Sequence, residues 1–286
     1  MGANMKRRKF LQASFVATAA GLAGCQTGTS DLLTRSHSSA SPGLSPSMST
    51  SQHRDSHVYE LRIYTVNPGK AEALHNRFRT ATLRLFKKHG VESVGYWMPT
   101  DPADQRLHFL LRYPSREARE ASWKAFMADP DWQAAYKASE AAGPILAKGP
   151  ENYFLQTTDY SPAATLGNLT KGGVWELRTY TTPPGGLGNI DARFRDHTIE
   201  LFRHHGIQSW AFFHRLADQP ESGTTLQYFV YHPSQEAAKN NFASFGQDPR
   251  WTTARKASEA AAGGSLTVPG GVKSTFLRAT DYSPLR

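Results

Sequence analysis

The chain has 286 residues, of which 39% are hydrophobic and 20% charged, enough for two domains of ordinary size with separate cores. Its formal net charge of +9 falls to +5 once the four basic residues of the first 24 positions are set aside. No segment combines a basic run with interleaved aromatic residues, which argues against a nucleic-acid partner. The single cysteine, Cys25, excludes a disulfide within the chain and a thiolate metal site.

Residues 1–25 have the parts of an export signal in order. Basic residues at positions 6–9, among them Arg7 and Arg8, precede an alanine-rich stretch at 10–24 that is too short to span a bilayer. The arginine pair resembles the twin-arginine signal, with an ordinary secretory signal as the alternative. The letters LAGC at 22–25 resemble a bacterial lipobox, which favours lipidation of Cys25 over a free buried thiol. We expect export through the twin-arginine pathway and a membrane-anchored lipoprotein, periplasmic or on the cell surface.

Residues 26–56 are rich in Ser, Thr, Pro and Gly and are expected to form a flexible tether. A duplication follows. Aligning 58–90 with 174–206 at a constant offset of 116 gives 16 identities in 33 positions, and the match resumes at DPDWQAAYKASEAA and DPRWTTARKASEAA and ends at FLQTTDYSP and FLRATDYSP. The predicted organisation is therefore a domain at 57–162, a linker at 163–173 and a second copy of the domain at 174–284.

Each copy shows the same order of predicted elements. In the first copy a strand at 58–66 is followed by a helix at 70–89, strands at 91–98 and 106–113, helices at 115–127 and 131–142, and a strand at 152–158. The order β-α-β-β-α-β is that of ferredoxin-like domains, whose four-stranded antiparallel sheet has helices on one face. Two copies can cover their open faces by packing sheet to sheet. The predicted fold class is α+β, with two tandem ferredoxin-like domains that form an intrachain dimeric α/β barrel.

The repeated strand carries polar side chains on one face. Because successive side chains of a strand point to opposite faces, Tyr59, Leu61 and Ile63 share one face. The other face carries a glutamate, an arginine and a tyrosine in each copy, namely Glu60, Arg62, Tyr64, Glu176, Arg178 and Tyr180. We expect the apolar set to lie under the helices and the polar set to point between the two sheets. Glu60 and Arg62, about 6.6 Å apart along the strand, are then close enough to pair.

Two interpretations of this polar set stay open. In the first, which we favour, ion pairs hold the two sheets in register, since structural networks also place ionisable residues in such positions. In the second, Arg62 and Arg178 hold an anionic or carbonyl-bearing ligand in a polar cavity while Glu60 or Glu176 orients it. On the neighbouring helix, Arg77 and Arg79 cannot share a face, so at least one of them is expected to be solvated.

Other motifs give little chemistry. No histidine spacing typical of a metal site is present, and no HExxH, GxSxG, P-loop, GxGxxG or CxxCH motif occurs, so no metal, no cofactor and no catalytic residues are predicted.

The segments VYELRIYTVNPGKAEAL and VWELRTYTTPPG, followed by LFKKHG and LFRHHG, resemble the NIPSNAP family in both copies. The resemblance implies a ferredoxin-like fold of the dimeric α/β barrel type, related in architecture to antibiotic-biosynthesis monooxygenases and small haem-degrading oxygenases. The family brings no agreed catalytic residues. Its better-known animal members are mitochondrial and linked to vesicle traffic and mitophagy signalling, a setting from which the export signal departs.

Two functions follow. The first is a lipid-tethered module that binds a small molecule in the barrel or a protein partner at the cell envelope, held on the membrane through Cys25. The alternative is a cofactor-light oxygenase or isomerase that acts on a small aromatic or carbonyl compound. We favour binding, because no catalytic constellation is recognised.

Overall fold

The computed structural model describes residues 55–162 and 172–286. The predicted export signal, most of the tether and nearly all of the linker, and with them Arg7, Arg8 and Cys25, lie outside the described residues. The elements of the first half are β1 (Val58–Thr65), α1 (Ala71–Arg77), the π-helical turn η1 (Phe78–Thr82), α2 (Leu83–Lys88), β2 (Glu92–Pro99), β3 (Arg106–Tyr113), α3 (Arg116–Ala128), α4 (Pro130–Ser139) and β4 (Glu151–Thr157). Those of the second half are β5 (Val174–Thr181), α5 (Leu187–Arg193), η2 (Phe194–Thr198), α6 (Ile199–His204), β6 (Gln208–Arg215), β7 (Thr225–His232), α7 (Gln235–Gln247), α8 (Pro249–Ala261) and β8 (Val272–Ala279).

Local sequence signals account for the ends of the helices. Ser115 caps α3 by accepting from the backbone N–H of Ala118, and Asp129 caps α4 from the position before Pro130. Gly90, with φ at 73°, ends the helix α2 in the left-handed region that glycine adopts without strain. No helix among residues 55–162 and 172–286 is long and apolar enough to cross a membrane.

The predicted helix at 70–89 has the expected extent but contains a wider turn in its middle. The hydroxyl of Thr82 donates to the carbonyl of Arg77 at 3.1 Å, five residues earlier, and the second half repeats the contact between Thr198 and Arg193 at 3.0 Å. Single π turns of this kind inside α-helices are frequent at functional sites. The hydrophobic pattern of the sequence does not reveal this turn, because the buried residues Leu74, Phe78, Ala81 and Leu85 still recur every three or four positions.

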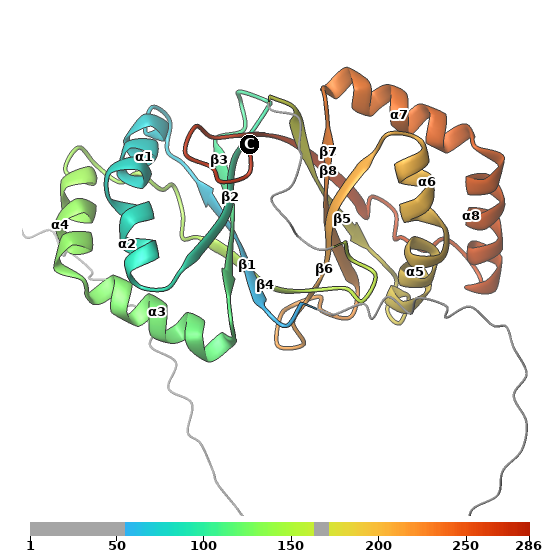
Figure 1. Cartoon of the computed structure of the whole chain (residues 1–286), viewed down its shortest axis with the longest axis horizontal. Coiled ribbons are helices and arrows are strands. Elements are labelled where there is room, and N and C mark those ends of the chain that lie inside the picture. The colour runs from blue at the N-terminus through green and yellow to red at the C-terminus, as the bar shows by residue number, and fades with distance from the viewer. Residues whose placement is uncertain (1–54, 163–171) are drawn as a thin grey trace, which may run out of the picture. The chain divides into compact units, whose positions relative to one another are not determined.

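The eight strands form a closed antiparallel barrel in the order β1-β3-β2-β8-β5-β7-β6-β4 (Figure 1). Each half contributes a ferredoxin-like sheet, and the barrel closes where β2 pairs with β8 and β4 pairs with β6. Helices α1 to α4 cover the outer face of one sheet and α5 to α8 that of the other (Figure 1). Closure leaves no strand edge unpaired in the barrel, which removes a route to aggregation. The predicted fold class is confirmed.

The interior of the barrel is a packed aromatic core rather than a polar cavity. It contains Tyr59 and Leu61 of β1 together with Trp97, Trp175 and Phe229, and the two tryptophan rings have centroids 5.6 Å apart. Each sheet also has one further core, which lies between it and its own helices.

The prediction of which side chains of the repeated strand face the barrel interior is therefore wrong. Tyr59 and Leu61 point into the barrel, whereas Glu60, Arg62 and Tyr64 lie under the helices of their own half. The set Glu176, Arg178 and Tyr180 lies in the same way under α7 and η2. The physical reason is that both faces of β1 are buried. The large apolar residues of two sheets converge in the barrel, and the charged groups find partners on the helices.

Two residues of the barrel interior have different counterparts in the second half. A Cβ on Gly95 would lie 2.2 Å from the ring of Trp97, so glycine is needed there, and the second half carries Ala211 and the smaller Phe213 at these positions.

His108 pairs in register with Ile63 and Trp97, and its burial lowers its pKa to about 4, which keeps the imidazole neutral.

The repeated TDYSP segment of each half packs on the other half. The ring of Tyr282 stacks on Phe78 with centroids 5.7 Å apart, and its hydroxyl lies 2.8 Å from Nδ1 of His75. Conversely, Tyr160 belongs to the core under the second set of helices, where it packs on Phe212. Each half thus completes the core of the other, which explains why the segment occurs twice in the sequence.

Candidate functional site

A pocket of about 290 Å³ lies between the sheet and the helices of the first half. Two residues of β1, Arg62 and Tyr64, contribute polar groups to its wall, and Arg77 at the end of α1 adds a second guanidinium. The remaining wall is largely aromatic and comes from η1, α2, α3 and α4, with Phe78, Phe86, Trp123, Phe126, Trp132 and Tyr136. We call this space the first-half pocket. It combines an apolar body with a few converging polar groups, as binding sites for small molecules do.

Arg62 is the most constrained polar group of the first-half pocket. It is 5% exposed, its Nη1 donates to Glu60, and its Nη2 donates to the hydroxyl of Tyr64 at 3.3 Å. Its guanidinium carbon lies 4.2 Å from the ring centroid of Trp123, a cation–π contact. The Nε of Arg62 is buried and has no hydrogen-bond partner. An unsatisfied buried donor costs about 1–3 kcal/mol, so a ligand oxygen at this place would stabilise the site.

Glu60 holds Arg62 in position. Its carboxylate accepts from Arg62, from Nε and Nη2 of Arg119 on α3 at 3.1 and 2.8 Å, and from the hydroxyl of Tyr113 at 3.2 Å. Burial alone would raise the pKa of Glu60, but the hydrogen bonds and charges of Arg119 and Arg62 outweigh burial and lower the pKa below its usual value. A carboxylate with a lowered pKa and four donors orients its neighbours and is poorly suited to act as a general base.

Arg77 brings a second buried cation to the pocket. Its Nη1 donates to Ser139 at 3.0 Å and to Glu140 at 2.9 Å, and its guanidinium carbon lies 5.6 Å from the ring centroid of Trp132. The Nε of Arg77, like that of Arg62, is buried without a partner. The prediction that Arg77 and Arg79 cannot both be buried is confirmed, because Arg79 is over a third exposed and pairs with acidic residues at the surface.

The second half arranges the same strand differently. The Nε of Arg178 donates to the hydroxyl of Tyr228 at 2.9 Å, and its Nη2 donates to that of Tyr180 at 3.1 Å. The carboxylate of Glu176 accepts from Arg178 and from Nε2 of His232 at 3.1 Å. Here the arginine has partners for its Nε and both Nη atoms, all supplied by the protein.

The structure therefore brings the six predicted residues together as two separate trios, one in each half. Glutamate and arginine pair within one strand, as the spacing predicts, and among these six described residues no hydrogen bond or ion pair crosses the barrel. Trp123, Trp132 and Tyr136 of the first-half pocket were not predicted as site residues. Their helical spacing is equally typical of core anchors, and only the position of Arg62 under α3 distinguishes the two roles.

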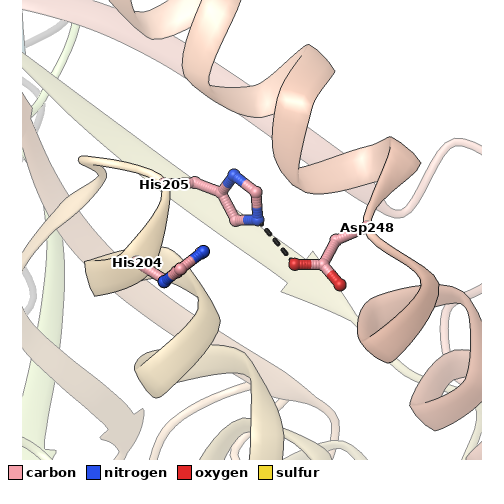
Figure 2. A group of neighbouring side chains, drawn as sticks. All are labelled: His204, His205 and Asp248. Atoms are coloured by element: carbon pink, nitrogen blue, oxygen red, sulfur yellow. Dashed lines mark hydrogen bonds and ion pairs between the residues drawn. The ribbon is translucent and has the colours of Figure 1, made fainter.

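A different cluster has the composition of a metal site. His204, His205 and Asp248 lie together where α6 ends and α8 begins, and each offers one ligand atom within 4.8 Å of the others (Figure 2). Both ring nitrogens of His205 are engaged, with Asp248 at 2.8 Å and Ser244 at 2.9 Å. Hydrogen bonds from Arg250, and next from His205, lower the pKa of Asp248, whose side chain also caps α8.

The first half repeats this arrangement with a lysine in place of one histidine. Nζ of Lys88 lies 2.7 Å from Asp129 and Nε2 of His89 lies 2.6 Å from the same oxygen. The shared feature is a helix-capping aspartate held by basic side chains, which needs no metal ion. The absence of a metal site stays a prediction.

The NIPSNAP family model matches residues 59–162, the half that contains the pocket. Residues 59–162 are therefore similar to a NIPSNAP domain. The chain is 27% identical over 147 residues to the mouse (Mus musculus) protein NipSnap homolog 3B, covering 50% of this chain and 56% of the relative. It is 25% identical over 133 residues to the NipSnap homolog of Dictyostelium discoideum, covering 46% and 52%. The chain thus spans about half the length of the curated relatives it matches.

The fold of the whole barrel is similar to that of a further solved structure. A solved structure of an anthrone oxidase-like protein aligns with 81% of this chain and 95% of its own, with a TM-score of 0.51 and 14% identity. At this identity the likeness supports the fold alone, and it extends across both halves of the barrel, beyond the residues that the NIPSNAP model matches.

Proposed function

We propose that this protein binds a small organic molecule in the first-half pocket of its NIPSNAP-like domain. The observation that carries the proposal is the buried Nε of Arg62, which lacks a partner at a pocket whose other walls are mostly aromatic. Buried donors are nearly always satisfied in folded proteins, so an orphaned one next to a pocket favours a ligand. The site predicted between the sheets moves to the space under the helices, because aromatic side chains fill the barrel.

The pocket sets the size and character of this ligand. At about 290 Å³ its volume lies just below the range of roughly 300–1,000 Å³ that is typical of ligand pockets. Trp123 and Trp132 offer flat apolar faces, and the exposed Met127 and Tyr136 lie at the same pocket. A compact aromatic molecule with at least one hydrogen-bond acceptor fits these walls.

The test is a calorimetric titration of the full chain with naphthylmethanol, a neutral aromatic probe with one hydroxyl. Met127 is 53% exposed, so Met127→Trp can obstruct the pocket without disturbing the core. The matched control is Gly246→Trp at the equivalent exposed position of α7. We expect binding to be lost in Met127→Trp and kept in Gly246→Trp. Equal binding by both variants would place the site elsewhere and refute the proposal.

An oxygenase or isomerase of the dimeric α/β barrel type is the alternative. The likeness to an anthrone oxidase-like protein favours it at the level of fold. Against it, Glu60 is held by four donors, and no histidine or cysteine is among the residues that line the pocket. Incubating the bound aromatic compound with the protein in air and following oxygen uptake and product formation distinguishes the two. Turnover would establish the enzyme, and recovery of the unchanged compound supports binding alone.

We further propose that the protein works at the cell envelope, exported by the signal at 1–25 and anchored by a lipid on Cys25, where a protein partner is a second expected contact. The arginine pair and the lipobox-like letters support this proposal. Replacing Arg7 and Arg8 by lysine should retain the chain in the cytoplasm, and Cys25→Ser should release it from the membrane fraction. Membrane association that survives Cys25→Ser would rule out the lipid anchor.

A further inference from the structure

We infer that the ligand of the first-half pocket is an aromatic carboxylate, one of whose oxygens accepts from the Nε of Arg62. The inference rests on the proposed binding function and names its substrate class. Its basis is a comparison of the two halves, which have the same strand arrangement and differ where a ligand would be recognised.

The first difference is a single hydroxyl. Arg62 pairs in register with Phe109 on β3, and Arg178 pairs in register with Tyr228 on β7. In the second half the Tyr228 hydroxyl accepts from the arginine Nε at 2.9 Å. In the first half the phenylalanine ring has no hydroxyl, and the Nε of Arg62 remains without a partner. The first half thus lacks an oxygen acceptor at a position where the second half supplies its own.

The second difference is charge. In the first half three guanidinium groups of low exposure, those of Arg62, Arg77 and Arg119, face two carboxylates, those of Glu60 and Glu140. One positive charge is therefore uncompensated among these buried groups. Arg119 also reaches the exposed Glu120 at 3.2 Å, but water screens such a surface contact.

The second half does not repeat this excess. Ala238 stands where the first half has Arg119, so Arg178 and Arg193 face Glu176 and Glu259 among the corresponding buried groups. Arg255 also reaches Glu259 at 3.6 Å, but it is 45% exposed, so water screens its charge. An anion in the first-half pocket would balance the extra charge, and hydrogen bonds between ionised partners are roughly twice as strong as neutral ones. A carboxylate suits this place better than a neutral acceptor.

The third difference concerns the aromatic body of the ligand. Trp123, Met127 and Tyr136 line the first-half pocket, whereas the second half has Phe242, Gly246 and Arg255 at the matching positions. The first half therefore keeps larger apolar surfaces beside the guanidinium whose Nε has no partner. An aromatic ring against these surfaces places its carboxylate toward Arg62.

The experiment compares two probes of similar shape on the full chain, naphthoate and the neutral naphthylmethanol. We expect naphthoate to bind at least about tenfold more tightly, the effect of one charge-assisted hydrogen bond. Phe109→Tyr supplies the hydroxyl that the second half uses and should abolish this preference while leaving the alcohol bound. Tyr228→Phe, the matched change in the other half, should leave both affinities unchanged.

A second variant guards against a Phe109→Tyr chain that folds poorly. Arg119→Ala reproduces the alanine of the second half and should weaken naphthoate binding several-fold with little effect on naphthylmethanol. Equal affinity for the two probes would overturn the inference that the ligand is a carboxylate and leave the proposed binding function standing. Failure of both probes to bind at millimolar concentration would refute both the inference and the proposed function.

Discussion

Glu60→Gln tests the network that positions Arg62. Glu60 is fully buried and accepts from two guanidinium groups and from a tyrosine hydroxyl. The amide keeps one acceptor oxygen, so about half of these contacts are lost and the positive charge of Arg62 and Arg119 is no longer balanced. Hydrogen bonds to charged groups contribute about 1.5–3 kcal/mol each, and breaking a buried pair costs about 3–5 kcal/mol. We expect the free energy of unfolding to fall by about 3–5 kcal/mol.

The assay is urea unfolding followed by circular dichroism, with the slope of the transition compared to confirm that the surface exposed on unfolding is unchanged. The control is Glu92→Gln. Glu92 pairs with Arg112 through both oxygens but is 53% exposed, so its loss should cost less than about 1 kcal/mol. If Glu60→Gln costs no more than Glu92→Gln at equal slope, the buried network does not hold Arg62 in place and the reasoning fails.

Three further predictions concern the barrel interior and the TDYSP segment that contains Tyr282. Because the pKa of His108 is lowered from its ordinary 6.5 to about 4, the unfolded chain binds this proton first, so stability falls by up to about 3 kcal/mol as pH drops from 6.5 to 4. His108→Gln should reduce the change in unfolding free energy between pH 6.5 and 5, and an unchanged pH dependence would argue against a neutral buried imidazole. Gly95→Ala should cost about 1–3 kcal/mol in a thermal melt through its clash with Trp97, with recovery in the double variant that adds Trp97→Phe; no recovery would place the cost in the backbone. Tyr282→Ala should lower the unfolding free energy by about 3 kcal/mol and Tyr282→Phe by only about 1 kcal/mol, and equal losses would mean that the hydroxyl rather than the ring joins the halves.

Much of the fold could be predicted from the sequence, because the duplication and the local patterns agree. The strand at 106–113 and the cap at Ser115 are found where expected, and two sheets with one uncovered face each have few ways to bury it. The prediction of which face of β1 lies under the helices is wrong for a physical reason. Alternation shows that Glu60 and Arg62 share a face, but both faces are buried, so the pattern alone does not say which one the helices cover.

The candidate site depends on contacts that no local pattern contains. The orphaned Nε of Arg62 follows from Phe109, which is distant in sequence and reaches β1 only through strand pairing. Trp123 becomes a wall of the pocket because α3 crosses above Arg62. Comparing the two copies position by position would have revealed the change from Tyr228 to Phe109, although its meaning needs the register of the strands.

The most direct test of ligand binding in the first-half pocket is a crystal structure of the full chain grown with naphthoate. We expect the ligand under α3 and α4, with a carboxylate oxygen about 3 Å from the Nε of Arg62 and the rings against Trp123. Ligand density between the two sheets beside Trp97 and Trp175, or in the second half beside Arg178, would contradict it.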